Sequence, residues 1–143
     1  MKQIRPIAIC VFRKGNRILV SEGYNRVKDE YFYRPLGGGI EFGEHSADTI
    51  CREVLEEVNL QAKRESLKYL GTLENIFQFN GETGHEIVFV YDGILEEPSV
   101  YEQRLVPGRE ANGEEIRAVW KSLDEFENQG LILYPTGLLE LLR

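Results

Sequence analysis

The segment from Gly38 to Leu60 contains three glutamates that lie three and four positions apart, Glu53, Glu56 and Glu57. On an α-helix these spacings place side chains on one face, so Glu53 meets both other carboxylates. Two carboxylates about 5 Å apart repel by roughly 3 kcal/mol at an effective dielectric constant of about 20. The cluster therefore predicts a bound cation. Mg²⁺, with Mn²⁺ as a substitute, fits because it binds carboxylates and shares its remaining positions with substrate phosphates.

The same segment resembles the Nudix box, the signature of the Nudix hydrolase family. The box reads Gly, five residues, Glu, seven residues, Arg-Glu-aliphatic, one residue, Glu-Glu, one residue, Gly-aliphatic. The matching positions are Gly38, Glu44, Arg52, Glu53, Val54, Glu56, Glu57 and Leu60. Asn59 stands in place of the box glycine. That position ends the helix in a left-handed conformation, which Asn tolerates better than other residues with a side chain, so we expect the helix to end normally.

The resemblance implies hydrolysis of a nucleoside diphosphate linked to another moiety, by water attack at phosphorus. In that family, divalent ions bind the box glutamates. By the resemblance, Glu53 and Glu57 would bind the metal directly with Glu56 beside them, and the backbone carbonyl of Gly37 would complete the coordination. Phosphoryl transfer needs positioning and charge neutralisation more than covalent help, and grouped carboxylates with Mg²⁺ would supply both.

Other residues around this cluster would orient the ligands or hold the substrate. By the resemblance, Arg52 and Glu44 form a pair that orients the metal ligands. Gly38 and Gly39 have no side chains, so the backbone there can approach an ion or a phosphate closely. Arg34 lies just before the glycines. It could clamp a phosphate with two hydrogen bonds or pair with a surface acid, and the sequence favours neither.

A further acid from outside the box is expected, because members of the family often take a metal ligand or general base from a distant loop or strand. Glu114 and Glu115 precede a strand expected at Ile116 to Trp120. Alternation along a strand turns only one of two consecutive side chains inward. We predict that Glu115 is the additional catalytic acid, with Glu86 as an alternative. All three could instead only solvate a loop or a strand edge.

Two weaker patterns do not predict a site on their own. Phe89 stands where a zinc motif beginning at His85 would have its second histidine, so His85 is not predicted to bind metal. Aromatic residues before the glycines could stack on a base, although aromatic side chains in strands are more often core. They are Tyr24, Tyr31, Phe32 and Tyr33.

Length and composition predict one domain over residues 1–143. The net charge of −7 argues against a nucleic-acid partner held through its phosphates. A phosphate substrate remains compatible with this charge, because a bound divalent ion reverses the local field. No apolar run is long enough to span a membrane, and no secretory core follows Met1. We therefore expect a cytoplasmic protein without a membrane partner that acts on a small nucleotide derivative, and a homodimer stays open.

Periodicity predicts an α/β fold, with a mixed sheet around a helix that starts after an N-cap at Ser46 and ends near Val58. The first two strands are expected to form a hairpin. The stretch from Glu96 to Gly113 is expected to be a long loop, because prolines and glycines interrupt it. The resemblance implies an α/β/α sandwich. Strands are expected at Ile7–Phe12, Arg17–Val20, Tyr31–Tyr33, Leu67–Phe79, Glu86–Leu95 and Ile116–Trp120, and short helices at Leu123–Gln129 and Thr136–Arg143.

These features favour a metal-dependent pyrophosphohydrolase, but they leave its substrate open. Family subgroups that cleave ADP-ribose or dinucleoside polyphosphates tend to carry proline or tyrosine shortly after the box, where this chain has Asn75, Ile76, Phe77 and Gln78. The longer aromatic and proline signature of NADH-cleaving members is absent too. The main alternative is a catalytically silent nucleotide-sensing or interaction module, which would be expected to have lost a box acid. An RNA-cap hydrolase would need a basic groove, which the composition does not indicate.

Overall fold

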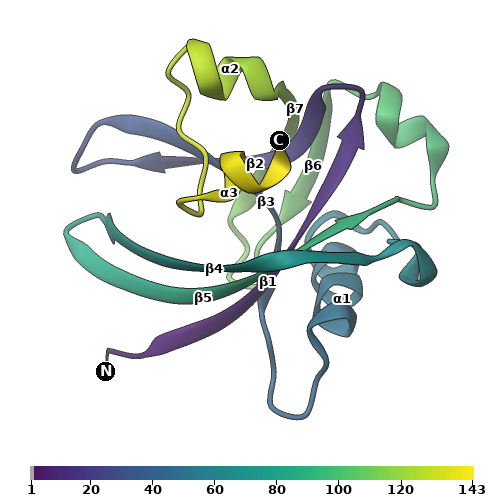
Figure 1. Ribbon diagram of the computed structural model, residues 1–143, viewed down its shortest axis with the longest axis horizontal. Coiled ribbons are helices and arrows are strands. Elements are labelled where there is room, and N and C mark those ends of the chain that lie inside the picture. Colours follow the sequence, from purple (N-terminus) through teal and green to yellow (C-terminus); the bar gives the residue numbers. More distant parts are fainter. Residues whose placement is uncertain (1) are drawn as a thin grey trace.

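The protein is described by a computed structural model over residues 2–143, with a seven-stranded mixed sheet at its centre (Figure 1). The strands are β1 (Ile4–Lys14), β2 (Arg17–Asn25), β3 (Glu30–Gly39), β4 (Lys68–Phe79), β5 (Glu82–Gly93), β6 (Leu105–Arg109) and β7 (Glu115–Ser122), in the order β4-β5-β1-β3-β2-β7-β6. The helices are α1 (Ser46–Val58), α2 (Leu123–Asn128) and α3 (Leu138–Leu142), with short 3-10 helices η1 (Arg64–Ser66) and η2 (Pro98–Glu102). The expected α/β fold with a mixed sheet is confirmed.

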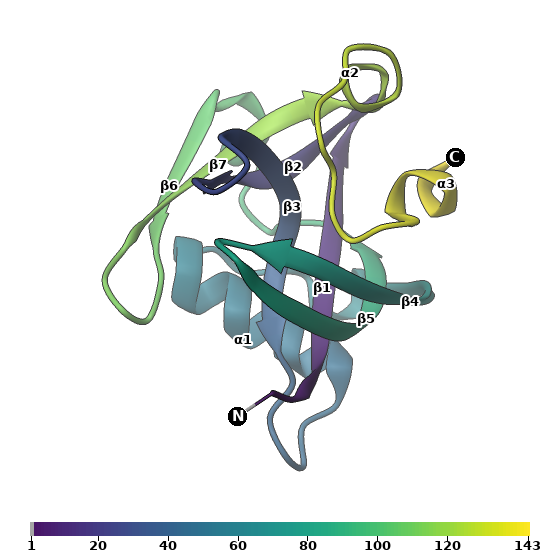
Figure 2. The ribbon, with the colours of Figure 1, turned by 90° about the vertical axis from the view of Figure 1, so that its left-hand side faces the viewer.

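Strand β1 lies in the middle of the sheet and is buried on both faces. Its continuous apolar run suits this position, because a strand covered on both sides does not alternate with polar residues. Ala8, Cys10 and Phe12 pack into the core shared with α1. Ile7 and Ile9, on the other face, pack into a second core with residues of α2 and α3. Helix α1 therefore covers one face of the sheet, while α2 and α3 lie on the other (Figure 2).

Helix α1 spans Ser46–Val58 and buries an apolar stripe against the sheet. Ile50, Val54 and Val58 form this stripe at helical spacing, so the predicted helix is confirmed. The expected N-cap is wrong by one residue. His45 takes the extended N-cap conformation, and the Ser46 hydroxyl instead lies 2.6 Å from the hydroxyl of Tyr91 on β5.

Asn59 ends α1 in the left-handed conformation, with φ 56° and ψ 38°, as its place in the box predicts. We expect Asn59→Gly to be neutral or to raise the free energy of unfolding by up to about 1 kcal/mol, because glycine adopts this conformation without side-chain strain. Chemical denaturation of both proteins measures the difference. A clear loss of stability would show that the Asn59 side chain makes a contact that the cap geometry does not require.

The region expected to be a long loop contains structure of its own. Residues 98–102 form η2, and β6 pairs antiparallel with β7 along the edge of the sheet. β6 is an edge strand, and edge strands are where sheets accept a proline such as Pro107. Gly108 lets β6 approach α1 closely, since a Cβ there would stand 2.2 Å from the carbonyl oxygen of Glu57. The loop prediction is therefore wrong for this part of the chain.

Two further expectations about strands needed correction. The expected hairpin of the first two strands is only a short one, because β1 and β2 pair only at Arg13–Ile18 and Lys14–Arg17, and β2 pairs mainly with β3 and β7. The strand expected at Tyr31–Tyr33 is longer, because β3 continues to Gly39, and the glycines Gly37 to Gly39 pair with β1. As strand residues, they hold a fixed place beside α1.

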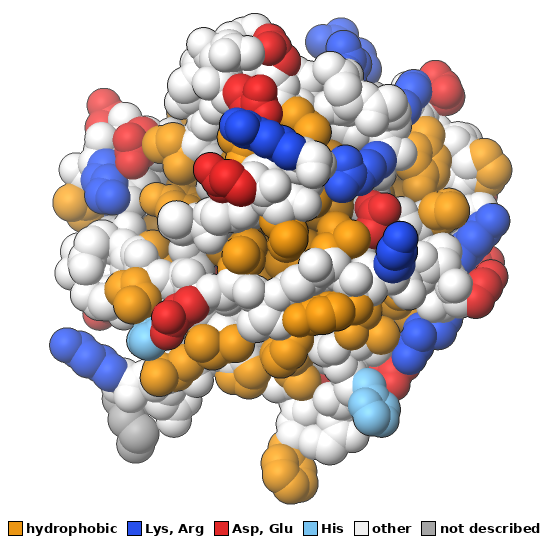
Figure 3. Space-filling model, in the orientation of Figure 1, with side chains coloured by type: hydrophobic (Ala, Val, Ile, Leu, Met, Phe, Trp, Pro, Cys, Tyr) orange, Lys and Arg blue, Asp and Glu red, His pale blue; other side chains and the backbone are white. Residues whose placement is uncertain are grey.

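Two further features concern the charges on the surface and the length of the helices. The face in Figure 3 carries charged side chains of both signs with apolar side chains between them, so no broad patch of one sign covers it. Within residues 2–143, no helix is long and apolar enough to cross a membrane.

Candidate metal and phosphate site

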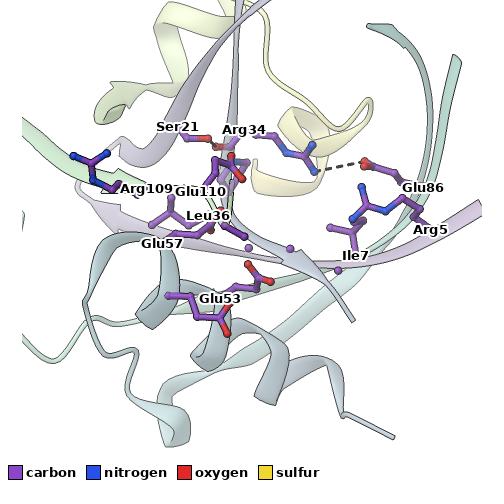
Figure 4. Close-up of a pocket in the computed structure, with 16 residues that line it drawn as sticks. Arg5, Ile7, Ser21, Arg34, Leu36, Glu53, Glu57, Glu86, Arg109 and Glu110 are labelled. Carbon is purple, nitrogen blue, oxygen red and sulfur yellow. Dashed lines mark hydrogen bonds and ion pairs between the residues drawn. The ribbon is translucent and has the colours of Figure 1, made fainter. Parts of the chain in front are cut away.

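A cavity of about 730 Å³ lies where the end of β3, helix α1 and the segment after β6 meet (Figure 4). Its lining combines backbone without side chains, carboxylates and guanidinium groups. These lining residues include Gly37, Gly38, Gly39, Glu53, Glu56, Glu57, Glu110, Arg5, Arg34 and Arg109. Most of the residues singled out in the sequence therefore meet around one space.

Arg52 holds together three parts of the chain beside this cavity. Its Nε and Nη2 atoms donate to the Glu44 carboxylate at 2.8 and 3.0 Å, and Nη2 also donates to the Gly39 carbonyl at 2.9 Å. Its Nη1 donates to Glu53 at 2.9 Å and to Glu56 at 3.3 Å. The pairing of Arg52 with Glu44 that the resemblance implies is present. The same guanidinium also fixes the end of β3 against α1.

Glu44 is the most firmly held carboxylate of this group. Hydrogen bonds from Arg52, and then from the Thr49 hydroxyl at 2.6 Å, lower the pKa of Glu44 to about 2. The hydrogen bonds that it accepts also raise the pKa of Arg52 further above its usual value. Glu44 therefore stays ionised at neutral pH and can anchor Arg52.

The three clustered glutamates are not gathered as a ready metal site. Among the side chains of residues 2–143, no group of three or more acids, histidines or cysteines is placed to hold a metal ion. Arg52 instead binds both Glu53 and Glu56 and neutralises part of their repulsion. Burial raises the pKa of Glu53, while its hydrogen bond from Arg52 works in the opposite direction.

Glu57 differs from the other two because no cation holds it. Its Oε1 atom is buried and has no hydrogen-bond partner within the described chain. Burial, followed by repulsion from Glu53 and Glu110, raises the pKa of Glu57 to about 8. A hydrogen bond from the Gly37 backbone N–H opposes this shift. A buried acceptor without a partner is costly unless something else binds there.

The raised pKa of Glu57 predicts how the metal-free protein depends on pH. A carboxyl group with a folded-state pKa above its unfolded value adds stability at low pH and loses it as the pH rises through the folded pKa. Between about pH 4.5 and pH 8, we expect the metal-free parent to lose roughly 1–3 kcal/mol more than Glu57→Gln does. Denaturation of both proteins in chelator across this range measures the difference, and parallel curves would contradict it.

Two acids near this cavity bear on the prediction of a catalytic acid from outside the box. Glu110 lines the cavity with Glu53 and Glu57, and sequence reasoning missed it because it follows the unpredicted strand β6. Glu115 is exposed at the start of β7 and lines a neighbouring cavity with Glu56 and Glu57. The only local signal for Glu110 was its place after a short apolar pair in a proline-containing segment.

Arg34 and Glu86 pair across the cavity wall, although 52 positions separate them in the sequence (Figure 4). Their contact is long, 3.5 Å from Nη2 to Oε1. Glu86 is only 3% exposed, so this acid does not solvate a strand edge. Arg5 lies beside it, and its guanidinium comes within 3.2 Å of the position that a Cβ on Gly39 would take. Arg34 thus pairs with an acid that is buried, and it still lines the cavity.

A comparison with known proteins finds a matching family model and several relatives. A family model described as NUDIX domain matches residues 2–137. Over 70 residues, the chain is 37% identical to an NAD-capped RNA hydrolase, NudC, of Pectobacterium atrosepticum, and 34% identical to one of Pseudomonas syringae pv. tomato. The first match covers 49% of this chain and 25% of that protein, and the second covers 49% and 24%. The chain thus aligns with about a quarter of the length of these curated relatives.

Solved structures with low sequence identity share the fold. A NUDIX hydrolase from Nitrosomonas europaea superimposes with a TM-score of 0.64 at 19% identity, covering 98% of this chain and 86% of that one. The E. coli ORF135 protein gives a TM-score of 0.57 at 18% identity, covering 99% of this chain and 89% of that one. At these identities, the likeness extends to the fold.

Proposed function

The chain belongs to the Nudix hydrolase family, and from this membership we propose that it hydrolyses a nucleoside diphosphate linked to another moiety, with the help of a divalent metal ion. The observation that carries the proposal is the buried Oε1 atom of Glu57, which lacks a partner in a cavity lined by carboxylates and arginines. A phosphoanhydride brings the negative charge and a metal ion brings the positive charge that such a lining suits.

The chemistry of the donor set, three carboxylates beside backbone without side chains, fits a hard divalent ion, although Glu53 and Glu56 are paired with Arg52 and are not gathered around one point. Glu57 offers an unused oxygen, and the Glu53 carboxylate packs directly against Gly38, where a Cβ would stand 2.4 Å from the Glu53 Cδ atom. Glu53, Glu56 and Glu57 would hold the ion, with Gly37 beside them. When bound, Mg²⁺ or Mn²⁺ would neutralise phosphate charge and lower the pKa of a bound water.

The chain's own residues have distinct tasks in this proposal. Arg5, Arg34 and Arg109 line the cavity and would bind phosphate oxygens. Arg52, anchored by Glu44, would orient Glu53. Gly38 and Gly39 let the substrate approach the backbone. The competing proposal, a silent nucleotide-binding module, is disfavoured because every acid of the box is present.

A hydrolysis assay tests the proposal directly. The purified protein is incubated with a panel of nucleoside triphosphates, ADP-ribose, NADH and NAD-capped RNA, with Mg²⁺, with Mn²⁺ or with chelator. We expect metal-dependent product release from at least one compound, with ¹⁸O from labelled water in a product phosphate. Binding without product in any metal would overturn the proposal and favour the silent module. Including the capped RNA also tests the expectation that no nucleic acid is bound, which remains a prediction.

The acid from outside the box is the subject of a separate prediction. Glu115 is the acid expected from the sequence, and Glu110 is the one that lines the cavity with Glu57. A lost metal ligand raises the Mg²⁺ concentration required, whereas a lost general base lowers the rate even at saturating Mg²⁺. We expect Glu110→Gln to have the larger effect, about tenfold or more, in a titration of rate against Mg²⁺. If Glu110→Gln and Glu115→Gln both match the parent, no acid from this segment takes part.

A further inference from the structure

A second cavity, of about 480 Å³, adjoins the candidate metal and phosphate site. The two cavities share Arg5, Arg34 and Glu86 in their linings, so a ligand in one can extend into the other. The second cavity is bordered by aromatic rings that the first lacks, from Phe32, Phe77, Phe79 and Tyr134. Its volume is in the range of pockets that take small ligands.

The aromatic rings are packed firmly in place. The ring of Phe32 contacts Tyr134 and Phe79 at centroid distances of 5.6 and 5.7 Å. It covers Gly23, where a Cβ would come within 2.4 Å of the ring. Phe77 covers Gly84 in the same way, at 2.3 Å. Rings held against glycine cannot turn freely, and they offer a planar ligand a surface for stacking.

A row of polar side chains crosses three strands beside these rings. Asn75 on β4 pairs in register with Glu86 on β5, and Glu86 pairs in register with Arg5 on β1. Neighbouring strands lie about 4.8 Å apart, so the row places an amide, a carboxylate and a guanidinium side by side. Arg5 in turn lies against Gly39, so the row leads from the aromatic cavity to the glycines of the first cavity.

Asn75 keeps a free donor although it is only 2% exposed. Its Oδ1 accepts a hydrogen bond from the Thr136 backbone N–H at 3.1 Å. That N–H needs an oxygen acceptor, so the other amide atom is the nitrogen. Within residues 2–143 this nitrogen has no hydrogen-bond partner, and it is not among the fully buried side-chain atoms without a partner. It is therefore available to a ligand in the cavity that Asn75 lines.

Glu86 supplies acceptors next to that donor. An ionised carboxylate only accepts hydrogen bonds and has about four lone-pair directions. Arg34 uses one of them, through the long 3.5 Å contact to Oε1. The cavity therefore presents the Asn75 N–H donor beside a carboxylate with acceptor capacity to spare, next to aromatic rings.

We propose that this cavity binds the guanine base of a nucleotide substrate, with Asn75 and Glu86 contacting its Watson–Crick edge. Guanine presents the O6 acceptor beside two donors, N1–H and N2–H₂. It would accept from Asn75 and donate twice to the Glu86 carboxylate, which makes three hydrogen bonds. Adenine, cytosine and uracil each offer this pair fewer donors. The inference rests on the proposed function, because the phosphates of the same nucleotide would lie toward Arg5 and Gly39.

Binding of analogues that cannot be cleaved tests the inference without depending on turnover. Calorimetry with Mg²⁺ compares the α,β-methylene diphosphates of guanosine, inosine, adenosine, cytidine and uridine. We expect the guanosine analogue to bind about tenfold more tightly than the inosine analogue, which lacks only the N2 amino group, and more tightly than the other three. Equal binding of all five, or tighter binding of another base, would overturn the inference.

Two variants assign the effect to the two residues. In Asn75→Asp, a carboxylate oxygen can still accept from Thr136, but the free donor is lost. In Glu86→Gln, one of the two acceptor oxygens is replaced by an NH₂ group, which cannot accept the second of the two hydrogen bonds that guanine donates side by side. We expect each variant to weaken guanosine-analogue binding about tenfold and to change adenosine-analogue binding less than threefold. Glu74→Gln is the matched control, because Glu74 lies next to Asn75 on β4 but pairs with His85 and is 63% exposed.

The outcomes separate this inference from the proposed function. If a guanine preference persists in both variants while their melting temperatures match the parent's, Asn75 and Glu86 do not read the base. If several nucleotides are hydrolysed with no base preference, the inference fails and the proposed function stands. If the guanosine analogue is preferred but nothing is hydrolysed in any metal, the inference stands and the proposed function fails.

Discussion

Glu57→Gln is expected to lower kcat by about 100-fold or more while the protein remains folded. The Glu57 carboxylate has a buried oxygen that no protein group satisfies, and its pKa of about 8 reflects the cost of holding that charge without a cation. Glutamine keeps the shape but removes the charge that would attract a metal ion. The metal-free variant is therefore also expected to melt at a higher temperature than the parent at pH 8.

The measurement combines steady-state kinetics over a range of Mg²⁺ concentrations with thermal melts in chelator. Glu74→Gln is again the control, because Glu74 is a glutamate on the exposed side of β4, outside the linings of both cavities. Near-parental kcat in Glu57→Gln would show that the unpartnered oxygen has no part in metal binding.

Gly37→Ala is expected to cause the largest loss of stability, about 3–5 kcal/mol, and to leave little folded protein. A Cβ at Gly37 would stand 2.0 Å from the Ala8 carbonyl oxygen and 2.7 Å from the Ile9 Cα atom. Both are backbone atoms of the central strand β1, which cannot move without disturbing the sheet. The glycine also has a φ of 155°, a backbone conformation that side chains disfavour.

Gly43→Ala provides the matched control for this prediction. Gly43 also has a positive φ, of 84°, but a Cβ there would meet nothing within 4 Å. It should therefore lose only about 1 kcal/mol, from backbone strain alone. Urea denaturation of both variants measures the contrast. If the two lose similar amounts, close packing against β1 is not what requires glycine at position 37.

The sequence was most informative where structure depends on neighbouring residues. Helix α1 and its left-handed end at Asn59 were predicted correctly, because helical periodicity and capping involve residues only a few positions apart. Strand β6 was missed because Pro107 and Gly108 are turn signals, and only pairing with β7 and contact with α1 make them compatible with a strand. Glu110, which follows that strand, was missed for the same reason.

In the candidate site too, contacts within a local motif could be predicted, whereas contacts between distant strands could not. The contact between Arg52 and Glu44 could be anticipated because both belong to one local motif. The contact of Arg34 with Glu86 could not, because it depends on the order of strands in the sheet. The row from Asn75 through Glu86 to Arg5 likewise exists only through the pairing of three strands. No local pattern in the sequence distinguishes Asn75 from an ordinary strand asparagine.

The central position of β1 has a consequence for how the chain folds. Its parallel pairing with β5 joins residues as far apart as Ile4 and His85, and such distant pairing costs more loop entropy and slows folding relative to local contacts. β1 also forms the wall between the two cores, so neither core is complete before β5 arrives. During synthesis, the box helix would therefore leave the ribosome well before the partner that completes the sheet beneath it. The glycines and glutamates of the site would reach their final places only in the late, cooperative step that closes both cores.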